Sequence, residues 1–140
     1  MFTRNQDMSE ERSLGSRVIR FSDFRWEGIE PAPYKEAGVD WSAVTRQLLL
    51  GPDEDAPFHL RYFEVEPGGY TTYERHEHQH VVVVLRGKGE VRLGDSWESV
   101  NYGDVVYVAP NEPHQLRASG DEPFGFFCIV RADRDPAVPL

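Results

Sequence analysis

The feature that most constrains this 140-residue chain is a succession of short runs rich in valine, isoleucine and aromatic residues. Turn-forming residues separate the runs, as in Gly87-Lys88-Gly89 and Pro67-Gly68-Gly69, and no stretch keeps the period of an amphipathic helix. The runs predict strands at Arg17–Phe21, Val44–Leu50, Phe58–Glu66, Tyr70–His76, His80–Arg86, Gly89–Leu93, Trp97–Asn101, Val105–Ala109, His114–Ala118 and Gly125–Arg131. Many short antiparallel strands joined by tight turns form a sandwich or a barrel, so the sequence predicts an all-β fold.

The length leaves room for one domain, which we expect to span residues 17–135, between a flexible N-terminus at 1–16 and a C-terminal tail at 136–140. Residues 22–42 form an irregular arm that contains Trp26, Tyr34 and Trp41. Such an aromatic arm must pack somewhere: over the outside of the barrel, across its mouth, or against a second subunit. The last alternative favours a homodimer.

Composition narrows the class of partner. The net charge of −9 argues against nucleic acid and against anionic membrane surfaces, both of which require a basic footprint. No apolar run reaches the roughly 20 residues of a membrane helix, and no secretory signal is visible. A single cysteine fits a reducing compartment. We therefore expect a cytoplasmic protein whose partners are small molecules or copies of itself.

Four of the five histidines fall in two places: three within residues 73–80, and the fourth, His114, directly after a turn. Imidazole binds transition metals well, and alternate positions of a strand point to the same side. The spacing therefore predicts a metal site, although a solvated polar hairpin would show the same histidines.

The two histidine-containing segments resemble the two motifs of the cupin superfamily. These motifs read G-x5-H-x-H-x3,4-E-x6-G and G-x5-P-x-G-x2-H-x3-N. Gly103 to Ala118 follows the spacing of the second motif, with His114 in the histidine place. His80 stands where the first motif has its glutamate, with six residues between it and Gly87, and Glu74 stands in the place of its first histidine. The resemblance covers residues 58–130 and implies a single-domain jelly roll that holds one divalent metal.

The resemblance implies the ligands Glu74, His76, His80 and His114, so that glutamate and histidine have exchanged places. Choosing His76 and His78 instead would leave only Gln79 to reverse the chain before His80, and a reversal needs at least two residues. We therefore expect His78 at the turn, where it orients a ligand or contacts substrate. Manganese or iron is the favoured ion, while nickel, cobalt and zinc fit the same donors.

Other residues carry two interpretations each. Cys128 lies in a run typical of an interior strand, where it is either a small core residue or a thiol facing the metal cavity. Arg46, Arg61 and Arg86 interrupt strand-forming runs; they lie on solvated faces or bind a substrate anion. Tyr107 is a core or rim aromatic, or a substrate contact.

The stretches Arg61–Gly69, Glu74–His80 and Gly125–Val130 resemble a narrower group, the bacterial cupins of methylthio-sugar salvage. That resemblance implies thiol-dependent release of the methylthio group of 1-methylthioxylulose 5-phosphate, with Cys128 in a redox role. Three alternatives remain: a non-catalytic metal- or ligand-binding cupin, a cupin dioxygenase, and a sugar isomerase. The substrate expected on any enzymatic reading is a small anionic metabolite.

Overall fold

A computed structural model of the chain describes residues 15–35 and 40–140. Its elements are β1 (Phe21–Ser22), β2 (Arg25–Trp26), β3 (Ala32–Pro33), β4 (Ser42–Leu50), a 3₁₀ turn η1 (Pro52–Glu54), β5 (Phe58–Tyr70), β6 (Glu74–Arg75), β7 (His80–Arg86), β8 (Gly89–Leu93), β9 (Ser96–Val100), β10 (Val105–Val108), β11 (His114–Ala118), β12 (Phe124–Arg131) and β13 (Val138–Pro139). Within the described residues there is no α-helix, which confirms the predicted all-β class.

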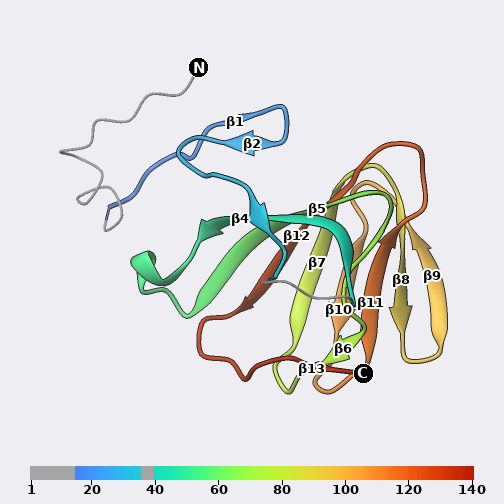
Figure 1. The fold of residues 1–140 in the computed structure, drawn as a ribbon. Coiled ribbons are helices and arrows are strands. Elements are labelled where there is room, and N and C mark those ends of the chain that lie inside the picture. The colour runs from blue at the N-terminus through green and yellow to red at the C-terminus, as the bar shows by residue number, and fades with distance from the viewer. Residues whose placement is uncertain (1–14, 36–39) are drawn as a thin grey trace.

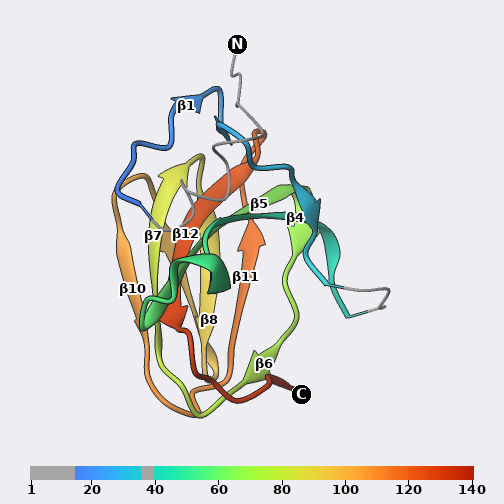
Figure 2. The same ribbon diagram turned by 90° about the vertical axis from the view of Figure 1, so that its left-hand side faces the viewer.

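The strands curl around a common interior (Figures 1 and 2). One wall runs through β10, β7, β12, β5 and β4, each antiparallel to its neighbour. The other wall runs through β9, β8, β11, β6 and β13. The pairing of Arg117 on β11 with Tyr70 at the end of β5 joins the walls. This arrangement confirms the predicted jelly roll.

The hydrophobic core fills the space between the walls, and β7 shows how it leads to a functional site. Alternate residues of β7 point inward: His80, Val82 and Val84 are all buried. Val84 packs in the core cluster with Phe124 and Phe126, whereas His80 stands at the end of the strand where the interior becomes polar. The period of two in the sequence therefore places a histidine and the core on one face of one strand.

Pro67-Gly68-Gly69 was predicted as a tight turn, and this prediction was wrong. The segment lies inside the long strand β5, where the pairing with β4 shifts from Val44–Val65 to Ser42–Tyr70. The additional residues form a bulge, and Gly68 takes the positive φ of 84° that the bulge requires. The bulge bends β5 so that one strand contributes to both walls.

The aromatic arm packs in two of the three expected ways. Trp26 is buried on the outer face of the first wall, with ring centroids 4.9 Å from Tyr62 and 5.7 Å from Phe127. Tyr34 instead packs edge-on to Phe63, at 5.6 Å, and lines the interior cavity. The arm thus covers the barrel and reaches its mouth. The third alternative, contact with a second subunit, stays a prediction.

Other differences from the predicted strands concern the two ends of the chain and the segment after β5. Only Phe21 of the expected strand Arg17–Phe21 is in a strand, because β1 pairs solely with the two-residue β2 in a short hairpin. The expected strand Tyr70–His76 is reduced to β6 beyond the end of β5. The expected tail contains β13, which pairs with β6. Residues 1–14 of the expected flexible terminus lie outside the described residues.

Candidate metal centre

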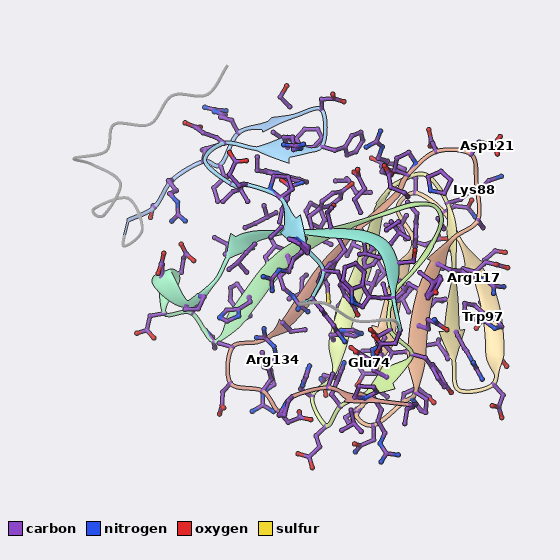
Figure 3. The ribbon with its side chains drawn as sticks, viewed as in Figure 1. Glu74, Lys88, Trp97, Arg117, Asp121 and Arg134 are labelled. Carbon is purple, nitrogen blue, oxygen red and sulfur yellow. The ribbon has the colours of Figure 1, made fainter. Side chains whose placement is uncertain are left out.

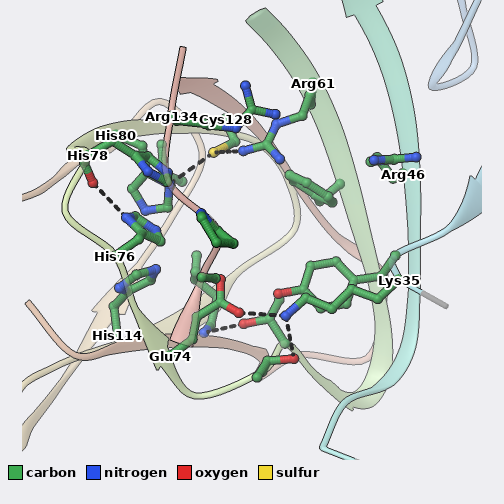
Figure 4. A pocket seen from close by; sticks show the side chains of 18 of the residues that line it. Lys35, Arg46, Arg61, Glu74, His76, His78, His80, His114, Cys128 and Arg134 are labelled. Carbon is green, nitrogen blue, oxygen red and sulfur yellow. Dashed lines mark hydrogen bonds and ion pairs between the residues drawn. The ribbon is translucent and has the colours of Figure 1, made fainter. Parts of the chain in front are cut away.

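Three histidines from separate elements meet inside the barrel. His76 follows β6, His80 begins β7 and His114 begins β11. One ring nitrogen of each lies within 4.8 Å of one ring nitrogen of the other two, and all three side chains are buried. Their ring centroids are 4.7 to 5.0 Å apart, and each pair of rings meets edge-on. Figure 4 shows the three rings grouped on one side of the cavity. The structure therefore brings together three of the four predicted ligands.

Hydrogen bonds to the backbone fix which nitrogen of two of these rings is free. Nδ1 of His76 lies 2.6 Å from the carbonyl oxygen of His78, and Nδ1 of His114 lies 2.8 Å from that of Glu112. A carbonyl oxygen only accepts hydrogen bonds, so both Nδ1 atoms carry the proton. The lone pair of each ring is then on Nε2. Metal-binding histidines commonly donate their other ring nitrogen in this way.

Burial also favours the uncharged form of the His80 and His114 rings. It lowers the pKa of His80 to about 2, and the nearby imidazoles of His114 and His76 act in the same direction. Burial is likewise the largest cause of the lowered pKa of His114. Neutral imidazole is the form that binds a metal, because a protonated nitrogen has no lone pair to offer.

The residues fit a divalent transition metal. Nε2 of His80 is buried and has no hydrogen-bond partner among the described residues, which is costly unless another group meets it. A metal ion bound by the three clustered imidazole nitrogens would meet this atom. Imidazole suits iron, nickel or zinc, whereas manganese also favours oxygen ligands such as a carboxylate. The choice among these ions stays a prediction.

Glu74 and His78 line the same cavity but lie outside the group of three. Oε1 of Glu74 accepts a hydrogen bond from Nζ of Lys35 at 2.5 Å. His78 lies in the bend between β6 and β7, as the spacing predicts. Its ring stacks on that of His76, with the ring centroids 3.7 Å apart and 4° between the ring planes. Glu74 as a fourth ligand stays a prediction. His78 packs against the ring of His76, a predicted ligand.

Asp135, which the sequence did not single out, holds this bend in place. Its Oδ2 accepts a hydrogen bond from the backbone N–H of Glu77, and its Oδ1 accepts from both the backbone N–H and Nδ1 of His78. These hydrogen bonds keep the pKa of the Asp135 carboxyl well below its usual range. Asp135 lies between β12 and β13, so a segment near the C-terminus of the chain braces the bend between the predicted ligands His76 and His80.

Cys128 faces the cavity, which encloses about 260 Å³. Its Sγ lies 3.3 Å from Nδ1 of His80 and accepts a hydrogen bond from Nη2 of Arg61 at 3.1 Å. Burial raises the pKa of the thiol, and the Arg61 charge opposes this effect. Cys128 is therefore both a core residue and a side chain next to the three clustered histidines.

The candidate substrate contacts divide into two groups. Arg46 and Arg61 line the cavity. Arg86 lies on the outer face, where it pairs with Glu64 at 2.9 Å, because a bulge in β7 opposite Gly125 and Phe126 reverses the alternation. Tyr107 is 55% exposed on the outer face of β10. Arg86 and Tyr107 therefore cannot contact a ligand in this cavity.

Arg134 and Lys35 also line the cavity, although nothing in the spacing of the sequence assigned either of them to the site. Figure 3 shows Arg134 and Glu74 toward the same end of the barrel, away from Lys88 and Asp121. Neither Arg134 nor Lys35 belongs to a motif or a strand pattern. The one signal available was that Arg134 adds a cation three residues after the end of a predicted interior strand.

Comparison with known proteins decides the family. The Cupin_2 family, described as a cupin domain, matches residues 61–130. The chain belongs to the cupin family. This cupin is 42% identical over 120 residues to the 1-methylthio-D-xylulose 5-phosphate methylsulfurylase of Rhodospirillum rubrum, a match that covers 84% of this chain and 76% of that protein.

Two further similarities place this cupin among its relatives. A cupin 2 conserved barrel domain protein from Rhodopseudomonas palustris has 38% sequence identity and a TM-score of 0.80, over 89% of this chain and 86% of that one. The glucose-6-phosphate isomerase of Pyrococcus furiosus is 47% identical over 58 residues, which are 38% of this cupin and 31% of that enzyme. Within its described residues, the cupin has no helix long and apolar enough to cross a membrane.

Proposed function

We propose that this cupin is a metal-dependent enzyme that releases the methylthio group of 1-methylthioxylulose 5-phosphate. The observation that carries the proposal is the position of Cys128, whose Sγ lies 3.3 Å from Nδ1 of His80. The other nitrogen of that ring belongs to the predicted metal centre. A thiol and a metal site thus share one small cavity, and the similarity to a protein named as a methylsulfurylase supports the choice of substrate.

The proposed chemistry transfers the methylthio group to the chain. The thiolate of Cys128 attacks the substrate sulfur and forms an S–S bond while the bond from sulfur to C1 breaks. The electron pair passes to C1 and the adjacent carbonyl as an enolate, and protonation of C1 gives 1-deoxyxylulose 5-phosphate. Two molecules of a small external thiol then reduce the disulfide on Cys128, release methanethiol and leave as their own disulfide. Carbon is reduced and the external thiol is oxidised, so the electrons balance.

Residues of the chain divide these tasks. Arg61 donates a hydrogen bond to Sγ of Cys128, which favours the thiolate. Lys35 and Glu74 form an ion pair in the same cavity, and Nζ of Lys35 also donates a hydrogen bond to the hydroxyl of Thr72. This pair can hold and return a proton near the substrate hydroxyls. A bound divalent ion would polarise the substrate carbonyl as a Lewis acid.

A second candidate, isomerisation of a phosphosugar, is favoured by the similarity to a glucose-6-phosphate isomerase. Isomerisation moves a proton between neighbouring carbons and needs no thiol. Cys128 therefore separates the two candidates: its loss abolishes methylthio release but leaves an isomerase active.

The test is to incubate the purified, untagged protein with 1-methylthio-D-xylulose 5-phosphate and dithiothreitol, and to measure methanethiol by gas chromatography. We expect release from the wild type and none from Cys128→Ser, which should keep its fold and its metal because Cys128 is not a ligand. Without external thiol, intact-mass spectrometry should find one methylthio group added to Cys128. A fully active Cys128→Ser variant would refute the thiol step.

A further inference from the structure

Three arginines line the cavity without a carboxylate partner. In the part of the chain that the structure describes, Arg46, Arg61 and Arg134 form no ion pair, although acidic residues outnumber basic ones by 24 to 15. Arg86 and Arg117, by contrast, are each paired with a glutamate. Uncompensated guanidinium groups in a cavity repel one another, so their grouping calls for an anion.

The sheet brings Arg46 and Arg61 together. On the inner face of β5, Arg61 and Phe63 are two residues apart, and Arg46 on β4 lies directly opposite Phe63. Arg46 is therefore a diagonal neighbour of Arg61, within reach of a long side chain. Opposite Arg61 on the other side is Cys128 on β12. Across the wall, the inward-facing side chains therefore follow one another in space: first Arg46 and Arg61, then Cys128, then His80 on β7.

Arg134 joins them from the segment between β12 and β13. It lines the same cavity as Arg46 and Arg61. Burial lowers the pKa of its guanidinium, and the charges of Arg61 and Arg46 act in the same direction. Among residues 15–35 and 40–140, both hydrogen bonds of Arg134 leave from Nη1, to the carbonyl oxygen of Arg131 and to Nδ1 of His59, so Nη2 and Nε remain for a ligand. Nε of Arg61 is buried and has no partner among the described residues.

We propose that Arg46, Arg61 and Arg134 form a subsite for the phosphate of a phosphorylated sugar. The proposal rests on the proposed function and adds the residues that select a phosphomonoester. Guanidinium groups suit phosphate because their forked donors match its oxygens, and three cations match a dianion better than a single carboxylate. Figure 4 shows Arg61 and Arg134 beside Cys128, and Glu74 with Lys35 elsewhere in the cavity. Phosphate bound by the arginines leaves the sugar to extend toward the thiol and the histidines.

Isothermal titration calorimetry with D-xylulose 5-phosphate and D-xylulose tests this subsite on the protein with the metal it carries. Neither sugar has a methylthio group, so binding is measured without turnover. A negative result would therefore refute the phosphate subsite without refuting the proposed methylthio release. We expect the phosphorylated sugar to bind at least about tenfold more tightly, since each charge-assisted hydrogen bond contributes that much. Xylonate, which carries one carboxylate charge, should bind more weakly than D-xylulose 5-phosphate.

Substitution assigns the effect to the three arginines. Arg46→Met, Arg61→Met and Arg134→Met should each weaken binding of D-xylulose 5-phosphate about tenfold or more and leave binding of D-xylulose unchanged. Arg86→Met is the matched control, because Arg86 lies on the outer face. The proposal is overturned if the two sugars bind equally, if xylonate binds as tightly as the phosphate, or if Arg86→Met causes the same loss. Circular dichroism of each variant verifies that it folds.

Discussion

Acidification should destabilise the metal-free protein, and His80 should account for a defined part of the loss. The folded protein keeps this ring neutral because burial, and to a smaller extent the nearby imidazoles of His114 and His76, lowers its pKa from 6.5 to about 2. Below pH 6.5 the unfolded chain therefore binds a proton that the folded protein does not bind. Stability then rises with pH up to about 6.5 and is lost as the pH falls through the range from 6.5 toward 2.

The magnitude follows from the width of the pH interval. Each pH unit in which only the unfolded chain is protonated costs about 1.4 kcal/mol, so the two units between 6.5 and 4.5 remove about 3 kcal/mol. Because the folded-state pKa lies far below 4.5, the ring stays neutral over this interval, and the size of the effect is set by the unfolded value of 6.5.

Urea denaturation in the presence of a chelator, at pH 7.5 and pH 4.5, measures this loss in the wild type and in His80→Gln. Glutamine fills part of the same space and does not titrate. The wild type should lose about 3 kcal/mol more than His80→Gln between the two pH values. If the two proteins lose the same free energy of unfolding, His80 is protonated in the folded state and the account of a neutral histidine centre is wrong.

Two further substitutions test the structure around the site. Asp135→Asn removes the charge and one acceptor from the three hydrogen bonds that hold the bend at Glu77 and His78, so metal affinity in a chelator competition should fall about 10- to 100-fold; unchanged affinity would show that the bend holds itself. Gly125→Ala places a Cβ 1.9 Å from Oη of the fully buried Tyr62, and should destabilise the fold by about 1–3 kcal/mol in thermal melts. Gly120→Ala meets only the flexible side chain of Lys88 and serves as its control, so equal melting shifts would contradict this packing argument.

The sequence predicted those parts of the site that lie on regular strands. His80, Val82 and Val84 follow the period of two, and the spacing from His80 to Gly87 and from Gly103 to His114 identified the elements that carry the histidines. The same period placed Tyr107 on a strand but could not tell its face, and the structure shows Val106 and Val108 in the core instead. Strand alternation therefore shows which side chains share one face of a strand, but it does not show whether that face points into the core or toward solvent.

Irregular backbone accounts for what the sequence could not predict. A bulge in β7 places Arg86 on the outer face, and another turns the glycine-rich segment of β5 into strand rather than turn. Arg134 and Asp135 reach the site from a segment without strand pairing, so no periodicity pointed to them. Their positions depend on hydrogen bonds across 57 or more residues of sequence, which only the folded chain reveals.

Metal content of the untagged protein and of single variants tests the central claim most directly. Elemental analysis of the wild type should find about one divalent transition metal ion per chain, in keeping with a three-histidine site of neutral nitrogens. His76→Ala, His80→Ala, His114→Ala and Glu74→Gln should each lose most of this metal. His78→Ala should keep it, because the His78 ring contacts His76 and Asp135 but lies outside the group of three. A wild type that neither contains nor takes up a transition metal, or a His78→Ala variant that loses it while His80→Ala retains it, would contradict the account.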